Sequence, residues 1–171
     1  TKGLRPKGKG RRPGVKMNSY REIAENRKTK QLRLADAALQ RYGLDVAGAC
    51  ITLISDADCL VFKVRVPVSI TPVLHPYLGR IEGKQFLLRL EDTAERRIAT
   101  TYSELVLLAA MLRETDLALP EPVPALDGSL VPELYDEDNS DDEPTQCVLF
   151  RWGNAPFPEA AFSRATHWQE N

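Results

Sequence analysis

The chain has 171 residues, 43% hydrophobic and 27% charged, which is enough for one compact domain with tails but not for two ordinary domains. Its three cysteines form neither a metal-type pair nor an even set, and no apolar run approaches the ~18 residues of a membrane span. These features argue against a disulfide scaffold, a zinc site and a membrane partner, and they predict a cytoplasmic location.

The formal net charge of −1 conceals an uneven distribution of charge along the chain. Residues 1–34 hold 12 of the 23 Lys and Arg and only two acids, so that their net charge is +10, whereas residues 136–143 carry six acids and no base. Residues 1–17 are rich in Gly, Pro, Lys and Arg, which predicts a disordered basic tail. This tail is either a solvated terminus or a segment that binds nucleic acid or another acidic partner through residues 1–16.

The first predicted element is an N-terminal helix. Residues 19–22 have the spacing of a capping box, and Gly43 provides a helix stop. Between them, apolar residues of helical period form one stripe, made of Leu32, Ala35, Leu39 and Tyr42. Two strands, over residues 49–54 and 60–66, then flank a polar turn at 55–58 and predict a hairpin. Residues 67–83 contain three prolines and two glycines and are predicted to be mostly loop.

A third strand is predicted over residues 85–90, where Arg89 interrupts an otherwise apolar run. A long helix follows, ended by the prolines at 120 and 122. Its predicted buried seam consists of Ile98, Tyr102, Leu105, Ala109 and Leu112. Residues 123–135 predict a hairpin that turns at Asp127 and Gly128, and residues 147–150 a last strand. Short connections between strands favour an antiparallel sheet with the long helix on one face, an α+β fold.

Five segments carry a resemblance to a known family: residues 86–90, 103–108, 119–124, 127–128 and 148–152. In order and spacing they resemble the aminoglycoside phosphotransferase family, which includes homoserine-kinase-like and choline-kinase-like small-molecule kinases. The resemblance extends over about residues 32–155. No single segment is specific, but their joint order is.

The resemblance implies a protein-kinase-like N-terminal lobe over residues 18–153, with an antiparallel sheet of about five strands, one long packed helix and an N-terminal helix. Residues 154–171 would then be the truncated start of a second lobe. The implied activity is phosphoryl transfer from ATP, with Mg²⁺ in the complete protein, to a hydroxyl or amine of a small-molecule acceptor.

The resemblance also implies cofactor-binding residues from four parts of this lobe: the hairpin turn over ATP, a basic residue on the third strand, an acid on the long helix, and a hinge whose backbone meets the adenine. They are Ser55, Asp56, Ala57 and Asp58; Arg89; Glu104; and Phe150, Arg151, Trp152 and Gly153.

The chemistry of Arg89 supports part of this assignment independently. A cation within an apolar strand needs a partner, and Glu104 on the next helix is a candidate. A paired arginine can also direct its planar fork at phosphate oxygens. The alternatives are a side chain that reaches solvent and an ion pair with a purely structural role. Kinases usually carry lysine at this position, so that arginine here is a departure.

Two further departures bear on activity. The turn at 55–58 has no glycine and contains two acids, which would repel a triphosphate unless a cation intervened. More importantly, His75 and His167 are the only histidines, and neither begins the catalytic loop that supplies the aspartate base. A later aspartate for Mg²⁺ is also missing, which predicts that this chain alone is inactive.

Two alternatives remain open at this stage. Trp152 could stack on a ligand or simply cover the edge of the core. The whole chain could also be a non-catalytic binding module that uses its basic N-terminal segment.

Overall fold

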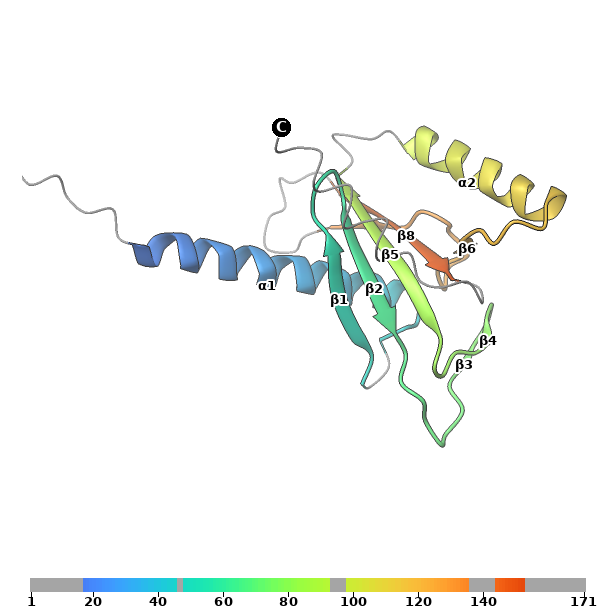
Figure 1. Ribbon diagram of the computed structural model, residues 1–171, viewed down its shortest axis with the longest axis horizontal. Coiled ribbons are helices and arrows are strands. Elements are labelled where there is room, and N and C mark those ends of the chain that lie inside the picture. Colours follow the sequence, from blue (N-terminus) through green and yellow to red (C-terminus); the bar gives the residue numbers. More distant parts are fainter. Residues whose placement is uncertain (1–16, 46–47, 93–97, 136–143, 153–171) are drawn as a thin grey trace, which may run out of the picture.

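The computed structural model describes residues 17–45, 48–92, 98–135 and 144–152. In these ranges it has the predicted α+β fold, with two helices and a six-stranded antiparallel sheet (Figure 1). The helices are α1 (Met17–Arg41) and α2 (Ile98–Glu114). The strands of the sheet are β1 (Cys50–Ser55), β2 (Leu60–Arg65), β5 (Gln85–Asp92), β6 (Glu121–Val123), β7 (Glu133–Leu134) and β8 (Thr145–Arg151). Two short strands, β3 (Leu74–His75) and β4 (Gly79–Arg80), form a separate ribbon.

Several predicted segments lie outside the described residues. They are the basic tail up to residue 16, the acidic run over residues 136–143, Gly153, and the proposed start of a second lobe over residues 154–171.

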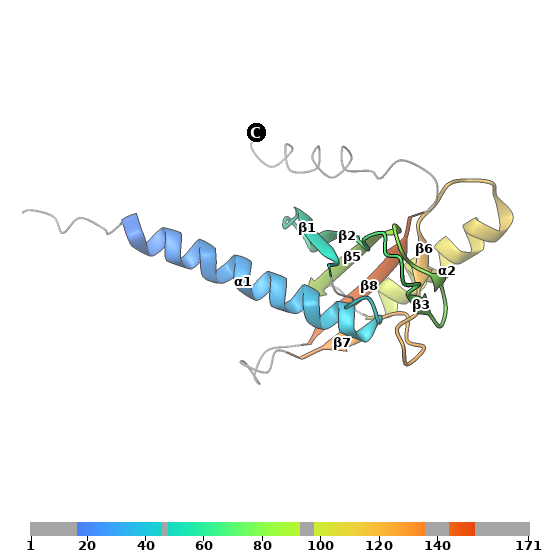
Figure 2. The same cartoon turned by 90° about the horizontal axis from the view of Figure 1, so that it is seen from below.

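The sheet has the strand order β1-β2-β5-β8-β6, so that β5 and β8 lie at its centre. Because side chains alternate along a strand, the central strands present two distinct faces. On β5, Phe86, Leu88 and Leu90 pack into the core cluster that contains α1 residues, whereas Leu87 packs into the cluster that contains Leu105 of α2. The two helices therefore cover opposite faces of one sheet (Figure 2).

The C-terminal half of α1 provides the larger core. The predicted apolar stripe is confirmed, since Ala35, Leu39 and Tyr42 are buried and Leu32 is partly buried against them. The helix ends at Arg41, and Gly43 has a φ of 65°, the left-handed conformation expected of a glycine at a helix C-terminus. The hairpin of β1 and β2 is also found, paired antiparallel with a register shift between Leu53 and Ser55.

The predicted seam of α2 is largely wrong. Leu105 is buried, but Ile98 and Tyr102 are 40% and 38% exposed, and Ala109 is exposed. The face that α2 turns to the sheet combines Leu105 with the buried Thr101, whose hydroxyl hydrogen-bonds Gln146 of β8. The pattern of apolar residues did not predict this face, because the sheet beneath α2 carries polar side chains that hydrogen-bond to polar residues of the helix.

The predicted hairpin over residues 123–135 is also wrong, although its turn is present. Asp127 accepts a hydrogen bond from the N–H of Ser129, and Gly128 has a φ of 85°. However, β6 and β7 do not pair with each other. Each pairs antiparallel with β8 along the same edge, β6 opposite residues 149–151 and β7 opposite residues 145–146. Residues 124–132 are thus an excursion between two pieces of one interrupted strand.

Residues 67–83 are mostly loop, as predicted, and are held against the sheet by polar contacts. The N–H of Val73 donates to Glu82 Oε1 at 2.6 Å, and the N–H groups of Val66 and Gly83 bond to the carbonyls of Lys84 and Val66. Hydrogen bonds from its own N–H and from that of Val73 hold the pKa of Glu82 below its ordinary value.

This lowered pKa predicts that the stabilising effect of the Glu82 carboxylate depends on pH. The stabilising contribution of Glu82 should be complete above the ordinary glutamate pKa of about 4.3 and be lost as the pH falls through the lower folded-state pKa. Glu82→Gln should therefore be less stable than wild type at pH 7, and the difference should narrow as the pH approaches 3. Urea unfolding across this range measures the effect, with exposed Glu114→Gln as the matched control. A difference that does not depend on pH would contradict the assignment.

Candidate functional site

Arg89 lies at the centre of the face that α2 covers. It is on the same side of β5 as Leu87 and Glu91, and its side chain is only 14% exposed. Its Nη1 donates to Oε1 of Glu104 at 2.8 Å, and its Nη2 donates to Oε2 at 3.2 Å. The predicted pairing of strand cation and helix acid is therefore confirmed, with the two-point geometry that guanidinium and carboxylate favour.

A second carboxylate, which the sequence reading missed, also contacts Arg89. Nε of Arg89 lies 2.8 Å from Oε1 of Glu91, whose side chain is 8% exposed. Glu91 follows Arg89 by two positions on the same strand, so the period of two was a usable signal for it. The guanidinium carbon also lies 5.6 Å from the centre of the Phe150 ring, within cation–π range.

These contacts determine the charge state of the site. Burial by itself would lower the pKa of Arg89, but the hydrogen bonds that it donates to Glu104 and the charges of Glu91 and Glu104 outweigh burial and leave the pKa raised. Arg89 is therefore a permanent cation. In formal charges, two carboxylates and one guanidinium give this group of three a net charge of −1, so the group alone does not attract an anion.

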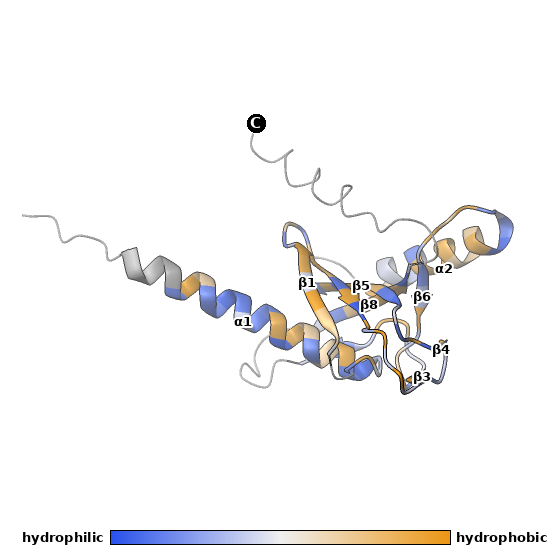
Figure 3. Ribbon diagram, turned by 60° about the horizontal axis from the view of Figure 1, so that its bottom comes forward, coloured by the Kyte–Doolittle hydropathy of each residue, from blue (hydrophilic) through white to orange (hydrophobic). Residues whose placement is uncertain are grey.

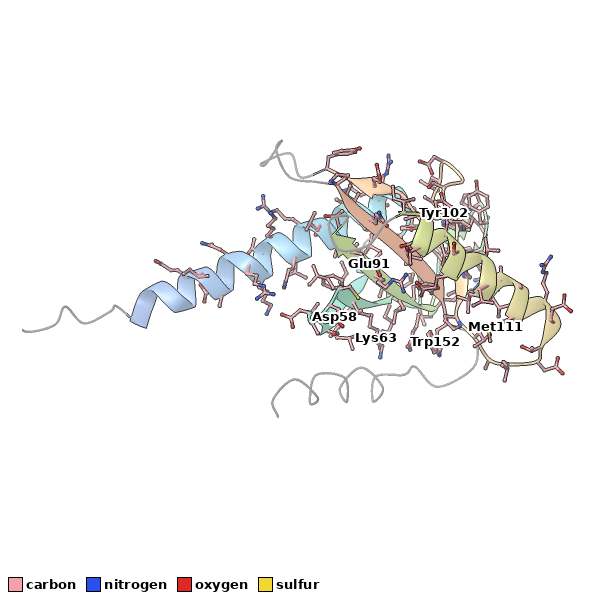
Figure 4. The ribbon with its side chains drawn as sticks, turned by 90° about the horizontal axis from the view of Figure 1, so that it is seen from above. Asp58, Lys63, Glu91, Tyr102, Met111 and Trp152 are labelled. Atoms are coloured by element: carbon pink, nitrogen blue, oxygen red, sulfur yellow. The ribbon has the colours of Figure 1, made fainter. Side chains whose placement is uncertain are left out.

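The strand register places further side chains around Arg89. Val61 is the cross-strand neighbour of Arg89 on β2, Lys63 is the neighbour of Leu87, and Leu87 in turn lies opposite Phe150 on β8. Val61, Leu87 and Phe150 are buried and form part of one apolar cluster. Lys63 and Trp152 are only partly buried, and Figure 4 shows Lys63 between Asp58 and Trp152. The face thus combines an apolar strip with a cation at its partly exposed side.

The residues of the predicted hairpin turn lie where the resemblance implied a turn. Ser55 is the last residue of β1, and Asp56, Ala57 and Asp58 are exposed between β1 and β2. Asp56 lies 3.6 Å from Nη2 of Arg27 on α1, in an ion pair that is more than half exposed on both sides. A surface pair of this kind contributes little to stability.

The predicted hinge residues divide between the two faces of the sheet. Phe150 is buried beneath the Arg89 guanidinium, and Trp152 follows it on the same face. Arg151 points to the opposite face and pairs with Glu121 of β6. The structure therefore brings Arg89, Glu104 and Phe150 together and places Arg151 apart from them.

Within the described parts of the chain, no three His, Cys, Asp or Glu side chains are grouped so that they could hold a metal ion. Neither of the two helices there combines the length and the apolar character that a bilayer crossing requires.

Comparison with known proteins identifies the fold. No family model and no curated protein matches the sequence. Among solved structures, a microcompartment-associated aminopropanol kinase matches with a TM-score of 0.54 at 24% identity, over 75% of this chain and 33% of that one. An amicoumacin kinase in complex with AMP-PNP and Ca²⁺ matches with a TM-score of 0.46 at 17% identity, over 79% of this chain and 34% of that one.

The chain thus spans about a third of the length of these two kinases. Its likeness to the aminopropanol kinase shows the fold, which is that of an α+β kinase-like N-terminal lobe.

Proposed function

We propose that this chain is the ATP-binding N-terminal portion of a small-molecule kinase of the aminoglycoside phosphotransferase type, acting in the cytoplasm. The observation that carries the proposal is the partly buried ion pair of Arg89 and Glu104, which joins the central strand β5 to α2. The fold shared with an aminopropanol kinase supports it. Residues 18–153 would form the lobe, and the acceptor, a small molecule with a hydroxyl or an amine, would be bound by parts of the protein beyond it.

The residues on this face suit a nucleotide in two respects. In this proposal the adenine ring lies at the edge of the apolar cluster that contains the buried Val61, Leu87 and Phe150, where Trp152 is only partly buried. Arg89 supplies a permanent positive charge beside that cluster. In this proposal the backbone at 150–153 meets the adenine, and the turn at 55–58 covers the phosphates.

The carboxylates around Arg89 limit the role that its guanidinium can have in nucleotide binding. Both Nη atoms of Arg89 are held by Glu104 and its Nε faces Glu91, so Arg89 acts as a fixed charge and not as a mobile phosphate clamp. Glu91 and Glu104, together with the acids of the turn, would repel the triphosphate, so the nucleotide would be bound as its Mg²⁺ complex. ATP supplies the phosphoryl group, and this chain contributes binding and orientation only.

Titration calorimetry with Mg·ATP tests the proposal. Wild type should bind saturably, and Arg89→Gln, checked to be folded, should bind about tenfold more weakly, because the positive charge beside the phosphates is lost. Arg89→Lys keeps the charge but loses the fork, and an intermediate affinity is expected. Arg113→Gln, an exposed substitution in the last turn of α2, is the matched control and should bind as wild type does.

Two results would overturn the proposal. The first is the absence of saturable Mg·ATP binding by folded wild type at millimolar nucleotide. The second is equal binding by wild type and folded Arg89→Gln. Transfer of phosphate to any acceptor by this chain alone would contradict the part of the proposal that leaves catalysis to residues beyond it.

A further inference from the structure

The connection between β2 and β3 exposes aliphatic side chains at the end of the sheet where β2 stops. In Figure 1 it forms the lower tip of the molecule, away from both helices. Val68, Ile70 and Leu74 are 86%, 103% and 74% exposed, and residues 66–79 include no Lys, Arg, Asp or Glu. Figure 3 shows hydrophobic stretches on this connection, whereas the exposed half of α1 is predominantly hydrophilic. Aliphatic side chains that gather at one tip mark an interaction surface, which scattered ones do not.

The exposure of these side chains is built into the fold, because the residues beneath the tip are buried and hydrogen-bonded. Val66 and Ile81 are buried, and the N–H of Gly83 donates to the carbonyl of Val66 at 3.0 Å. His75 is also buried, and its Nε2 lies 2.6 Å from the carbonyl of Tyr42. The base of the tip is therefore fixed, and its apolar side chains remain in solvent.

The backbone of the tip suits a partly apolar environment. A polar group that leaves water without a partner costs free energy, and this applies to each backbone N–H. Three of the residues 67–76 are prolines, which have no N–H. The N–H of Thr71 donates to Oγ of Ser69, and that of Val73 donates to Oε1 of Glu82. Several backbone positions of the tip thus need no hydrogen bond to water.

Cations lie at the base of the tip. Residues 65–84 contain three cations and one acid, so that their net charge is 3 − 1 = +2. Arg65, the last residue of β2, and Arg80 of β4 are exposed, and Lys84 is partly buried. The acid, Glu82, has a largely buried side chain that lies 3.7 Å from Nε of Arg80 and accepts from a backbone N–H. The charge that this segment presents to the solvent is therefore positive.

These properties favour a lipid surface over a protein partner. A protein interface relies on anchors such as Trp, Tyr and Arg that fill matching pockets, whereas the outermost residues of this tip are aliphatic. A bilayer accepts aliphatic side chains without a matching pocket, and its anionic headgroups attract cations that lie beside them. Tyr77, which is half-exposed, is of a type that is enriched at the level of the headgroups.

We propose that the tip formed by residues 67–78 inserts into the interfacial region of an anionic phospholipid bilayer. Val68, Ile70 and Leu74 enter the boundary between headgroups and acyl chains, and Arg65 and Arg80 contact the lipid phosphates. The lack of a long apolar run, on which the expectation of no membrane partner was based, does not bear on a contact of this kind. The inference does not depend on nucleotide binding at Arg89.

Cosedimentation of the full chain with phospholipid vesicles measures this contact. The vesicles contain phosphatidylcholine, either alone or mixed with an equal amount of phosphatidylserine. Val68→Ser/Ile70→Ser should lower the partition coefficient of the mixed vesicles at least about tenfold, because two apolar side chains no longer leave water. The matched control is Val106→Ser/Leu107→Ser, which replaces two exposed aliphatic residues on α2 and should bind as wild type does. Circular dichroism of both variants establishes that they remain folded.

Two further measurements examine the charge and the depth of the contact. Arg65→Gln should weaken binding to the mixed vesicles about fivefold and leave binding to phosphatidylcholine alone unchanged. A tryptophan introduced by Ile70→Trp should be quenched by brominated acyl chains, whereas one introduced by Val106→Trp should not. This readout reports the tip itself, independently of any other cation of the chain that the vesicles attract.

Four results would overturn the inference. They are the absence of vesicle binding by folded wild type, equal binding by wild type and the Val68/Ile70 variant, equal losses in that variant and the α2 control, and no quenching at position 70. A dimer of wild type without lipid that the Val68/Ile70 variant converts to a monomer would assign the tip to a second copy of the chain instead.

Discussion

Replacing Arg89 by leucine should lower the free energy of unfolding by about 3–5 kcal/mol at pH 7, the usual cost of removing one partner from a buried ion pair. The reason lies in Glu91, whose side chain is 8% exposed and whose Oε1 is 2.8 Å from Nε of Arg89. Without the guanidinium, Glu91 and Glu104 would both lose the cation that they share, and the charge of Glu91 would remain buried. Urea unfolding followed by circular dichroism measures the loss.

A second variant separates the charge effect from simple loss of packing. In Arg89→Leu/Glu91→Leu the buried charge is removed together with its partner, and we expect most of the lost stability to return. Exposed Arg113→Leu serves as the control and should change stability by less than about 0.5 kcal/mol. If the single and double variants are equally unstable, the guanidinium acts through packing and not through charge.

Tyr42 is the second position where a large effect is expected. Its side chain is fully buried, its hydroxyl donates to the carbonyl of Cys147 on β8 at 3.2 Å, and its own carbonyl lies 2.6 Å from Nε2 of His75. Burial raises the pKa of Tyr42 well above its ordinary value, so the hydroxyl remains a donor. Tyr42→Ala should cost about 3–5 kcal/mol, as for other large aromatic side chains in cores.

Tyr42→Phe isolates the hydrogen bond. It keeps the ring but leaves the Cys147 carbonyl without this donor, and a loss of about 1 kcal/mol is expected. Thermal or urea unfolding of the two variants gives both numbers. Equal losses for phenylalanine and alanine would mean that the hydroxyl, and not the ring, holds α1 against β8.

The features that could be predicted from the sequence are those that depend on residues close together in the chain. The stripe of α1, the hairpin of β1 and β2, and strand β5 all follow from local periodicity, and each is present. The pairing of Arg89 with Glu104 was also accessible, because a cation in an apolar strand requires an acid and the following helix offers one.

The errors lie where one element meets another. The face of α2 was misassigned because Thr101 and Glu104 contact polar side chains of the sheet. The spacing of apolar residues along the helix carries no information about such polar contacts. The split of one strand into β6 and β7 depends on the length of β8, which pairs with both. Glu91 was missed because the predicted strand ended at residue 90, whereas β5 continues to Asp92 and carries Glu91 beside Arg89.

The position of Arg89 has a further consequence for any ligand that comes to this face. A long cationic side chain usually loses rotational freedom when it meets its target, which weakens the complex. Here two of the nitrogens are already held by Glu104 and the third lies beside Glu91, so that this loss of freedom occurs once, when the polypeptide folds. An incoming molecule would meet a preorganised surface, and its association should need little rearrangement of this side chain.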